Sequence, residues 1–392
     1  MGKNRAADLR DCRKTLKTVQ VMCREDSVKM ENKLEKARKI INDVDAQMAE
    51  LFVRRMRAAE MVYEHKKQFG LPILDQAREN AVIEKNTQLI EDELLKGYYI
   101  DFIKNVMSVS RAYQYRMQSG LKVAYSGVEG AFAHIAAGRI FPEGNRISCR
   151  DFQAAYDSVV NGENDVAVLP IENSYAGEVG QTIDLIFSGP LFINGIYELE
   201  IHQNLLGVAD ATVEDIKTVI SHPQALSQCH DYIELRKFET VEDNNTALAA
   251  RSVAKANDKS VGAIASAETA ALYGLKVLEA NINKSGENTT RFAVLSRVRA
   301  DSAALSSSVL MFTVKHEAGS LANAISIIGK YGYNMTALRS SPMKKNSWQY
   351  YFYIEIDGIL DNENGKQMLE ELKKVCDILK IAGTFAPHTT LR

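Results

Sequence analysis

The pentapeptide Asn288-Thr289-Thr290-Arg291-Phe292 decides how the middle of this chain folds, because it leads into the apolar run Phe292-Ala293-Val294-Leu295. Such a run is typical of a buried strand. The pentapeptide delivers an amide, a hydroxyl and a guanidinium to the mouth of that strand, as a site for an anionic ligand requires. On its own the pentapeptide is most simply interpreted as a polar turn. The segments before and after it must therefore show whether it belongs to a binding site.

The composition is that of an ordinary soluble protein of two to four domains, with 392 residues, 46% hydrophobic and 25% charged. The net charge of −2 favours neither nucleic acid nor a membrane as partner. The five cysteines lack C-x-x-C spacing, which argues against a zinc site or disulfides and predicts a reducing, cytoplasmic location. We expect no membrane-spanning helix and no signal peptide.

Residues 1–33 are predicted to form a weakly helical extension of unknown role, with an anion-binding arm as the alternative. Residues 34–118 are predicted to form an all-α domain. Apolar residues recur along 34–68 at steps of three, four or seven, as on one face of a helix. Gly70-Leu71-Pro72 ends this helix, a second begins near Asp75, and a third covers 98–118. So small a domain cannot cover so long a stripe, which predicts that a second copy of the chain buries it.

Polar residues converge from all three predicted helices. Arg55 and Lys66 share a face of the first predicted helix. Asp75, Arg78 and Glu79 stand at i, i+3 and i+4 at the start of the second, and Ser110 and Gln114 continue an apolar line along the third. The pattern fits a cationic cavity inside a bundle or a set of intrahelical ion pairs, and spacing leaves both open. The set comprises Arg55, Lys66, Asp75, Arg78, Glu79, Ser110 and Gln114.

With Arg38-x6-Asp45 before them, these residues resemble the active-site pattern of the all-helical class of chorismate mutases. The resemblance implies a pericyclic rearrangement of chorismate to prephenate, which needs no nucleophile, metal or cofactor. It implies that Arg55 and Arg38 from a second copy bind carboxylates and that Arg78 orients the substrate. The implied remaining contacts are Lys66 and Gln114 to the ether oxygen, Glu79 to the hydroxyl, and Asp75 and Ser110 around the substrate.

Residues 121–297 alternate strands with helices, and the strands end in small polar clusters, including 172–174, 221–228 and 245–247. Ligands of such sheets bind beyond the strand ends, so the clusters are either helix caps or parts of one site. A turn around Gly130 leads to a helix N-terminus suited to an anion, and the dinucleotide fingerprint is absent. His134 is interpreted as a packing or capping residue rather than a general base.

This segment resembles prephenate dehydratase through Pro170-Ile171-Glu172-Asn173-Ser174, Ser221-His222-Pro223-Gln224, Asn245-Thr246-Ala247 and Thr290-Arg291-Phe292. The family implies two α/β lobes, like a periplasmic binding protein, with prephenate between them. Loss of hydroxide needs a proton or a strong hydrogen bond, which makes Thr290 the expected catalytic group. Arg291 is expected to bind a carboxylate or to form a structural salt bridge, and Ala131 and Ala133 stand where hydroxyl residues are frequent. The expected substrate contacts are Glu172, Asn173, Ser174, Ser221, Gln228 and Arg291.

Residues 308–386 are predicted to form a ferredoxin-like βαββαβ domain. Strands are expected at 309–314, 334–338, 350–356 and 381–385, and helices at 320–331 and 367–380. The pattern resembles the ACT small-molecule-sensing domain and implies phenylalanine as effector, with a purely architectural dimerisation domain as the alternative. Arg339 and Ser341 replace a Glu and an Arg of the commonest form. The expected effector contacts are Gly319, Ser320, Leu321, Asn334 and Ser340.

Together these patterns predict a multidomain, cofactor-free and metal-free bifunctional chorismate mutase/prephenate dehydratase with phenylalanine feedback, assembled as a homodimer or homotetramer. One alternative is a monofunctional prephenate dehydratase whose helical domain only dimerises, and the intact cationic set argues against it. The other is a non-enzymatic amino-acid-sensing protein, which would not need Thr290 in this polar setting.

Overall fold

The computed structural model describes residues 5–283, 288–301, 304–343, 349–387 and 389–391, with side chains from residue 33 onward. The chain divides into two compact units, Met1–Gln118 and Ser119–Arg392, and each is described by itself. Among the described residues, no helix is long and apolar enough to cross a membrane.

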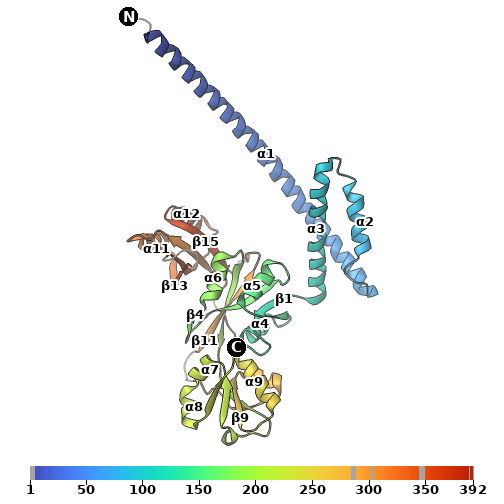
Figure 1. The fold of residues 1–392 in the computed structure, drawn as a ribbon, viewed down its shortest axis with the longest axis vertical. Coiled ribbons are helices and arrows are strands. Elements are labelled where there is room, and N and C mark those ends of the chain that lie inside the picture. Colours follow the sequence, from blue (N-terminus) through green and yellow to red (C-terminus); the bar gives the residue numbers. More distant parts are fainter. Residues whose placement is uncertain (1–4, 284–287, 302–303, 344–348, 388, 392) are drawn as a thin grey trace. The chain divides into compact units, whose positions relative to one another are not determined.

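The first unit consists of α1 (Arg5–Phe69), α2 (Gln76–Thr87) and α3 (Glu93–Ser119), which confirms the predicted three helices (Figure 1). Two boundaries differ from the prediction. α1 begins at Arg5 rather than Leu34, because no Gly or Pro interrupts the chain between Gly2 and Gly70. α3 begins at Glu93, a turn before the predicted start. Asp75 caps α2 by accepting a hydrogen bond from the Arg78 backbone N–H at 2.9 Å.

From Lys33, where its described side chains begin, α1 is covered by the other two helices only in its C-terminal part. Ala59 and Tyr63 are buried with Ile103 and Met107 of α3, and the Tyr63 hydroxyl donates to the Met117 carbonyl at 3.2 Å. The predicted apolar stripe is exposed in the single chain. Its large members are Ile41, Val44, Met48, Leu51 and Val62, with exposed fractions between 42% and 56%, and its small member Ala58 is also exposed.

The second unit is built on a large sheet in the order β13-β14-β12-β15-β5-β11-β3-β1-β2, with β16 on β5 and β4 on β3. A smaller sheet has the order β10-β6-β9-β7-β8. The larger sheet comprises β1 (Lys122–Ser126), β2 (Asn145–Cys149), β3 (Val166–Asn173), β4 (Gly177–Glu178), β5 (Phe192–Glu200), β11 (Thr289–Ser296), β12 (Ser307–Val314), β13 (Asn334–Pro342), β14 (Tyr350–Asp357), β15 (Cys376–Phe385) and β16 (Thr389–Leu391). The smaller comprises β6 (Asn204–Gly207), β7 (Thr218–Ser221), β8 (Glu239–Glu242), β9 (Val261–Ala265) and β10 (Lys276–Glu279).

The helices of this unit are distributed over the two sheets. The larger sheet has a hydrophobic core on each face, and neighbouring residues of β1 point into different cores. Val123 and Tyr125 pack with α4, whereas Ala124 packs with α5 and α6. The remaining helices belong to the smaller sheet or to the C-terminal segment. The bounds are α4 (Phe132–Ile140), α5 (Phe152–Val160), α6 (Gly180–Ser188), η1 (Val213–Asp215), α7 (Pro223–Gln228), α8 (His230–Arg236), α9 (Thr246–Ala256), α10 (Ala267–Tyr273), α11 (Ser320–Lys330) and α12 (Glu363–Leu372).

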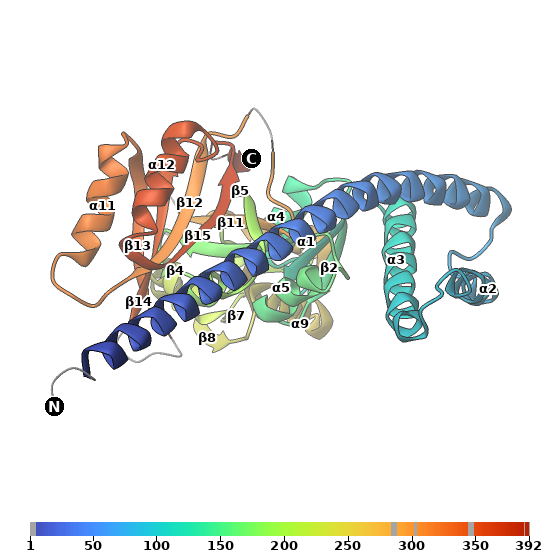
Figure 2. The same ribbon diagram turned by 90° about the horizontal axis from the view of Figure 1, so that it is seen from above.

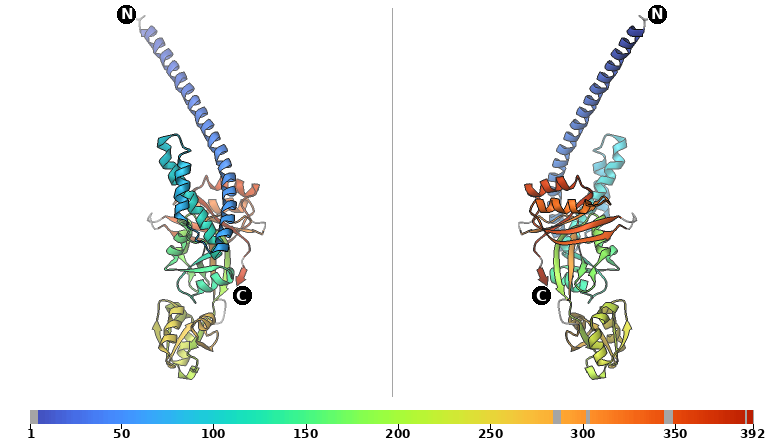
Figure 3. Two further views of the ribbon diagram at one scale, coloured as in Figure 1. Left: turned by 90° about the vertical axis from the view of Figure 1, so that its right-hand side faces the viewer. Right: turned by 90° about the vertical axis from the view of Figure 1, so that its left-hand side faces the viewer.

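Two lobes are thereby formed, as predicted, and Figure 3 shows the smaller one in yellow-green. The chain leaves the larger lobe between β5 and β6 and returns between β10 and β11. The returning strand corrects the prediction of a polar turn at 288–292, because β11 already begins at Thr289 and pairs with both β3 and β5. A strand paired on both sides gains two ladders of backbone hydrogen bonds, which outweighs the turn preference of its polar residues.

The C-terminal segment has the predicted βαββαβ order, with α11 and α12 side by side (Figure 2). The predicted helix at 367–380 is wrong at its end: α12 stops at Leu372, and Cys376 begins the strand β15. Strand β15 pairs with β12 along its length, so long-range pairing overrides the local helical pattern.

This segment shares its sheet and its core with the dehydratase-like segment. Gly383 of β15 pairs with Ile193 of β5, and a Cβ at Gly383 would lie only 2.1 Å from the Ile193 carbonyl oxygen, so this approach requires glycine. One face of β12 and β14, including Met311 and Tyr353, packs into the same core as α5 and α6. The predicted domain end at 386 is followed by β16, which pairs with β5.

Candidate active sites

A cavity of about 200 Å³ lies inside the helical unit. Four basic and two acidic side chains line it, so its charge suits a dianion. It contains every predicted mutase residue except Arg38. Its lining residues are Arg55, Lys66, Ile73, Asp75, Arg78, Glu79, Val82, Met107, Ser110, Arg111 and Gln114.

Two cationic groups of this cavity, those of Arg55 and Lys66, are held by partners on α3 and in the link between α1 and α2. Arg55 donates to the Ser110 hydroxyl and, at 3.3 Å, to the Val106 carbonyl. Burial lowers the pKa of Arg55, and the nearby Glu79 carboxylate opposes this shift. Lys66 donates to the Ile73 carbonyl, which positions its ammonium at the end of α1.

Two further residues of this cavity, Arg111 and Gln114, add to its charge and its hydrogen-bonding groups. Arg111 forms an ion pair with Glu79 and lines the cavity, although the sequence did not single it out. Its neighbour Ser110 was predicted, but only the packing of α3 against α2 shows that Arg111 turns inward. The buried Gln114 donates to the Ser110 carbonyl at 3.4 Å, and its Oε1 has no hydrogen-bond partner among the described residues. A buried amide with an open position is available to a ligand. Arg38 is exposed on α1 and does not line the cavity.

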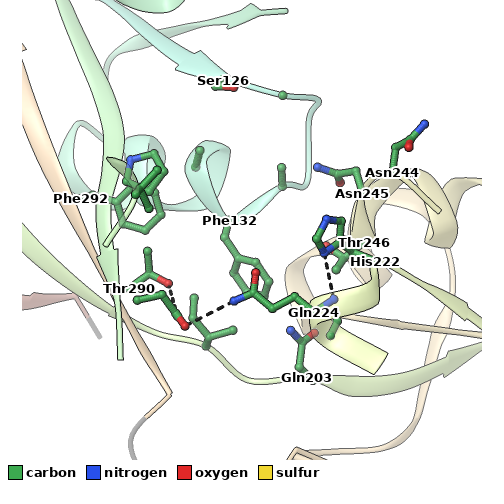
Figure 4. A pocket seen from close by; sticks show the side chains of 18 of the residues that line it. Ser126, Phe132, Gln203, His222, Gln224, Asn244, Asn245, Thr246, Thr290 and Phe292 are labelled. Carbon is green, nitrogen blue, oxygen red and sulfur yellow. Dashed lines mark hydrogen bonds between the residues drawn. The ribbon is translucent and has the colours of Figure 1, made fainter. Parts of the chain in front are cut away.

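A second cavity, of about 440 Å³, lies between the two lobes of the second unit (Figure 4). Among the described residues that line it there is no Asp, Glu, Lys or Arg. The larger lobe contributes Ser126, Gly127, Ala131, Phe132, Ala133, Phe152, Pro170, Asn173, Val179, Thr290 and Phe292, the connecting segment Ile201 and Gln203, and the smaller lobe His222, Gln224, Ala225, Gln228, Asn244, Asn245 and Thr246.

Thr290 and Asn173 face each other across β11 and β3 at the wall of this cavity. The Asn173 Oδ1 atom accepts hydrogen bonds from the backbone N–H groups of Tyr175 and Ala176, at 3.0 and 2.9 Å. These bonds fix the orientation of the amide, so its Nδ2 must be the group that donates to Thr290 Oγ1 at 2.9 Å. The Thr290 hydroxyl accepts this bond and is therefore left to donate its own proton.

Helix N-termini also reach this cavity. Asn245 caps α9 by accepting from the Ala247 N–H at 2.8 Å. The N-cap of α4 is Ala131, whose side chain cannot accept a hydrogen bond, so the first N–H groups of α4 lack a side-chain cap. Gln203, which sequence reasoning missed, donates to Gln228 at 3.3 Å, and its buried Oε1 has no partner in the described chain. No motif marks Gln203, because it lies in the connection between the lobes.

Four of the predicted dehydratase contacts do not line this cavity. Glu172 and Arg291 turn to the opposite face of their strands, since each is adjacent to a residue that faces the cavity. Ser174 accepts from the Thr289 N–H at 2.9 Å, and the fully buried Ser221 donates to the Ile264 carbonyl at 2.6 Å. Ser174 and Ser221 therefore form hydrogen bonds with backbone groups of neighbouring strands.

Glu172 and Arg291 belong to a set of ion pairs with the C-terminal segment, which favours the structural salt bridge over the carboxylate contact for Arg291. Arg291 binds both oxygens of Glu355, at 2.9 and 2.8 Å, and Glu172 at 3.1 Å. Arg339 also pairs with Glu172. Burial alone would raise the pKa of Glu355, but the Arg291 guanidinium holds it below its usual value.

His134 packs and caps, as predicted. Its Nδ1 accepts from the Gly130 N–H at 3.2 Å, and its ring lies 5.1 Å from that of Tyr125. Burial, together with the nearby Arg146, lowers the pKa of His134.

The predicted effector residues lie at separate places in the C-terminal segment. Gly319 is the N-cap of α11, with a φ of +85° that favours glycine, and Ser320 and Leu321 follow in the first turn. Asn334 begins β13 and donates to Asp357 at 2.9 Å, while Ser340 is exposed further along that strand.

The family models agree with this division of the chain. Residues 37–115 match the model of chorismate mutase type II, and residues 123–300 match that of prephenate dehydratase. A bifunctional chorismate mutase/prephenate dehydratase of Aquifex aeolicus is 30% identical over 363 residues, which cover 90% of this chain and 97% of the relative. The corresponding protein of Neisseria gonorrhoeae is also 30% identical, over 89% of this chain and 95% of its own.

Solved structures resemble the second unit. A prephenate dehydratase of Arthrobacter aurescens in complex with L-Phe has a TM-score of 0.63 and 25% identity, covering 68% of this chain and 90% of its own. A structure described as GqqA, a novel type of quorum quenching acylase, has the same TM-score and 29% identity, over 68% of this chain and 97% of its own.

A helical unit with a cationic cavity and a two-lobed α/β unit with a cleft define an enzyme with two sites for small anions. The chain belongs to the bifunctional chorismate mutase/prephenate dehydratase family. It rearranges chorismate to prephenate and dehydrates prephenate to phenylpyruvate. Both alternatives, a monofunctional dehydratase and a non-enzymatic amino-acid sensor, are set aside.

Proposed function

We propose that Thr290 assists the departure of hydroxide in the dehydratase reaction. In this reaction the bond from the ring to a carboxylate breaks, its electrons make the ring aromatic, and the ring hydroxyl leaves. Hydroxide is a poor leaving group and needs a hydrogen bond or a proton as it departs. The observation that supports Thr290 most strongly is the locked Asn173 amide, which occupies the acceptor side of the Thr290 hydroxyl and directs its proton elsewhere.

Neutral donors bind the prephenate carboxylates in this proposal. The N-terminus of α4 carries partial positive charge and has no side-chain cap, so its N–H groups suit one carboxylate. The amides of Gln203, Gln224 and Gln228 supply further donors on the cavity wall. Ala131 and Ala133, where hydroxyl residues are frequent in the family, restrict the α4 contact to the backbone.

In the mutase cavity we assign the carboxylates of chorismate to Arg55 and Arg78 and the ether oxygen to Lys66 and Gln114. Rearrangement separates charge across the breaking carbon–oxygen bond, so fixed cations and donors at that oxygen lower the barrier. The Gln114 Nε2 atom carries two N–H groups and donates one of them to the Ser110 carbonyl, so the second N–H supports the last assignment.

A second copy of the chain completes the mutase cavity in this proposal. Val44, Met48 and Leu51 are exposed on α1, and a row of exposed apolar residues on one helix needs a covering surface. Arg38 lies on the same helix N-terminal to this row and outside its own cavity. An antiparallel second copy of α1 would bring Arg38 to the cavity of the first, which corresponds to a homodimer or a homotetramer made of such dimers.

We further propose that phenylalanine regulates the enzyme at the C-terminal segment, which we assign to the ACT class. The relative from Arthrobacter aurescens was solved with L-Phe, and Gly319 has the positive φ that leaves backbone open to a ligand. Gly319 and Asn334 stand at opposite ends of α11, whose 11 residues span about 16 Å. One phenylalanine cannot touch both in one chain, so the effector site combines two copies.

A reducing cytosol is the location we infer, since Cys149, Cys229 and Cys376 are free cysteines.

The proposed role of Thr290 is tested by Thr290→Val in the full chain, with Thr289→Val as the matched control one residue away on the same strand. Chorismate is converted through to phenylpyruvate in one coupled assay, with and without phenylalanine. Thr290→Val should lower dehydratase kcat about 10²- to 10³-fold and leave mutase turnover unchanged, because one donor to the leaving group is lost. Near-normal phenylpyruvate formation by Thr290→Val rules the role out, and insensitivity of the native chain to phenylalanine rules out the effector.

A further inference from the structure

A cluster of four charged side chains joins the C-terminal segment to the strands that carry Thr290 and Asn173. We call Glu172 (β3), Arg291 (β11), Arg339 (β13) and Glu355 (β14) the interdomain ion cluster. Arg291 bridges Glu172 and Glu355, and Arg339 does the same from the other side, pairing with Glu172 and lying 3.5 Å from Glu355. Two cations thus alternate with two carboxylates in a closed ring.

The cluster is largely removed from water, which makes each charge dependent on its partners. The side-chain exposed fractions are 2% for Glu355, 13% for Arg291, 18% for Arg339 and 28% for Glu172. Tyr353 adds a hydrogen bond to Glu355 at 2.8 Å and places its ring 5.3 Å from the Arg339 guanidinium. Loss of Arg339 would leave the carboxylates of Glu172 and Glu355 sharing the single cation of Arg291, and the strands would shift to solvate the excess negative charge.

The position of the cluster in the sheet connects it to the dehydratase cavity. Strand pairing sets Thr290 opposite Asn173 and Arg291 opposite Glu172. Neighbouring residues of a strand point to opposite faces, so the first pair faces the cavity and the second faces β13 and β14. The bond between Arg291 and Glu172 therefore holds the same two strands whose other face holds the Asn173–Thr290 bond.

Arg339 is the member that the C-terminal segment adds to Glu172. A carboxylate at this position would be a third beside Glu172 and Glu355. Arg339 instead balances them. Its neighbour Ser341 points the same way and donates to Glu178 at 2.8 Å, on the strand β4 that pairs with β3. Arg339 and Ser341 thus both contact the dehydratase strands.

We propose that Arg339 is a positioning residue of the dehydratase reaction, acting from the C-terminal segment through Glu172 and Arg291 on the Asn173–Thr290 pair. This inference rests on the proposed role of Thr290. The C-terminal segment then contributes to the dehydratase reaction even without an effector. The reason is that the strands at the cavity wall are held in register only while Arg339 closes the ion cluster.

The test compares Arg339→Met with Arg299→Met in the full chain. Arg299 is the matched control, because it also joins the dehydratase segment to the C-terminal segment, through Asp361, but lies away from β3 and β11. Arg339→Met should lower dehydratase kcat about 10- to 100-fold with little change in KM, as displacement of a reacting group does. Mutase turnover of the same protein, and both activities of Arg299→Met, should stay at the native level.

Two further variants keep the test decisive if Arg339→Met folds poorly. Arg339→Lys keeps the charge but not the fork that reaches two carboxylates, so it should recover part of the lost kcat. Glu172→Gln combined with Arg339→Met removes one charge of each sign and should lose no more than the worse single variant. Thermal unfolding of each protein separates a loss of folded enzyme from a loss of kcat.

Dehydratase kcat within about twofold of native in folded Arg339→Met would overturn the proposal, as would an effect on KM alone. A kcat of Arg339→Lys no higher than that of Arg339→Met would also contradict it, because the retained charge would then have no effect. An equal loss in Arg299→Met would also overturn it, since any contact between the segments would then serve. If Thr290→Val is inactive while the Arg339 variants are normal, only this inference fails. If Thr290→Val is active, the proposed function fails and Arg339 has no pair to position.

Discussion

The mutase cavity is lined by four basic and two acidic side chains, whereas no Asp, Glu, Lys or Arg lines the dehydratase cavity in the described chain. Both sites take a dicarboxylate, so the ligand alone does not explain the difference. The reactions explain it. Chorismate keeps both carboxylates while it is compressed into a reactive conformer, and cations offset their repulsion. Prephenate loses one carboxylate as neutral CO2, and a cation bound to it would stabilise the substrate more than the transition state.

The neutral dehydratase cavity is challenged most directly by Asn173→Asp, which keeps the shape and adds one negative charge. The change removes the donor to Thr290 and opposes a dianion, so dehydratase kcat/KM should fall about 10³-fold while mutase turnover holds. Steady-state assays of both reactions on one preparation measure this. Asn161→Asp, the same change at an exposed helix end, is the control. If Asn173→Asp retains activity, charge neutrality of the cavity is irrelevant to the reaction.

The charged mutase cavity is challenged by Arg55→Met, which keeps the apolar stem and removes the guanidinium. We expect mutase kcat/KM to fall about 10²- to 10³-fold, since a charge-assisted bond to a carboxylate is lost, and dehydratase turnover on added prephenate to stay normal. Arg57→Met provides the control, because Arg57 pairs only on the exposed side of α1 with Glu60. A mutase that works without Arg55 would contradict the assignment of the cavity.

We expect the mutase site to need Arg38 from a second copy of the chain, whereas the dehydratase site should need no residue from a second copy. Arg38→Met and Arg55→Met should each lack mutase activity alone, but their mixture should recover about a quarter of the native activity. Half of the dimers are then mixed, and one of the two cavities in each mixed dimer has both arginines. Dehydratase activity should be unaffected throughout. Absence of recovery after unfolding and refolding the mixture would place Arg38 outside the mutase site.

Ionic strength should separate the two sites by a smaller factor. Between about 0.05 and 0.5 M salt, mutase kcat/KM should fall several-fold because screening weakens attraction of the dianion to four cations. Dehydratase kcat/KM should change less than about twofold, since short hydrogen bonds to neutral donors are screened little. Equal salt dependence of the two activities would contradict the contrast between the cavities.

The lining of the cavity in the helical unit could be predicted from the sequence because helix spacing is regular. Residues eleven apart return to one face, so Arg55 and Lys66 were expected on one face, and both line the cavity. Arg111 was missed, because which face of α3 meets α2 depends on their packing and not on spacing.

The dehydratase residues were predicted less well, for a reason that lies in strand geometry. Glu172 stands next to Asn173 and Arg291 next to Thr290, and sequence proximity suggested one polar cluster. A strand sends neighbours to opposite faces, so half of that cluster belongs to the cavity and half to the interdomain ion cluster. Gln203 carried no signal, because its place between the lobes exists only in the folded chain.

By itself the sequence determined the three helices, the alternation of strands and helices in the α/β unit and the βαββαβ order, since hydrophobic periodicity and turn residues are local properties. It also determined that Thr290 stands at one end of a strand, whereas the two lobes were implied by the resemblance to a family. Only the tertiary structure decided that 289–292 belong to a strand and that β15 joins two segments into one sheet. It also decided which of two adjacent polar residues lines the cavity. These choices depend on partners far away in the chain, which no local pattern records.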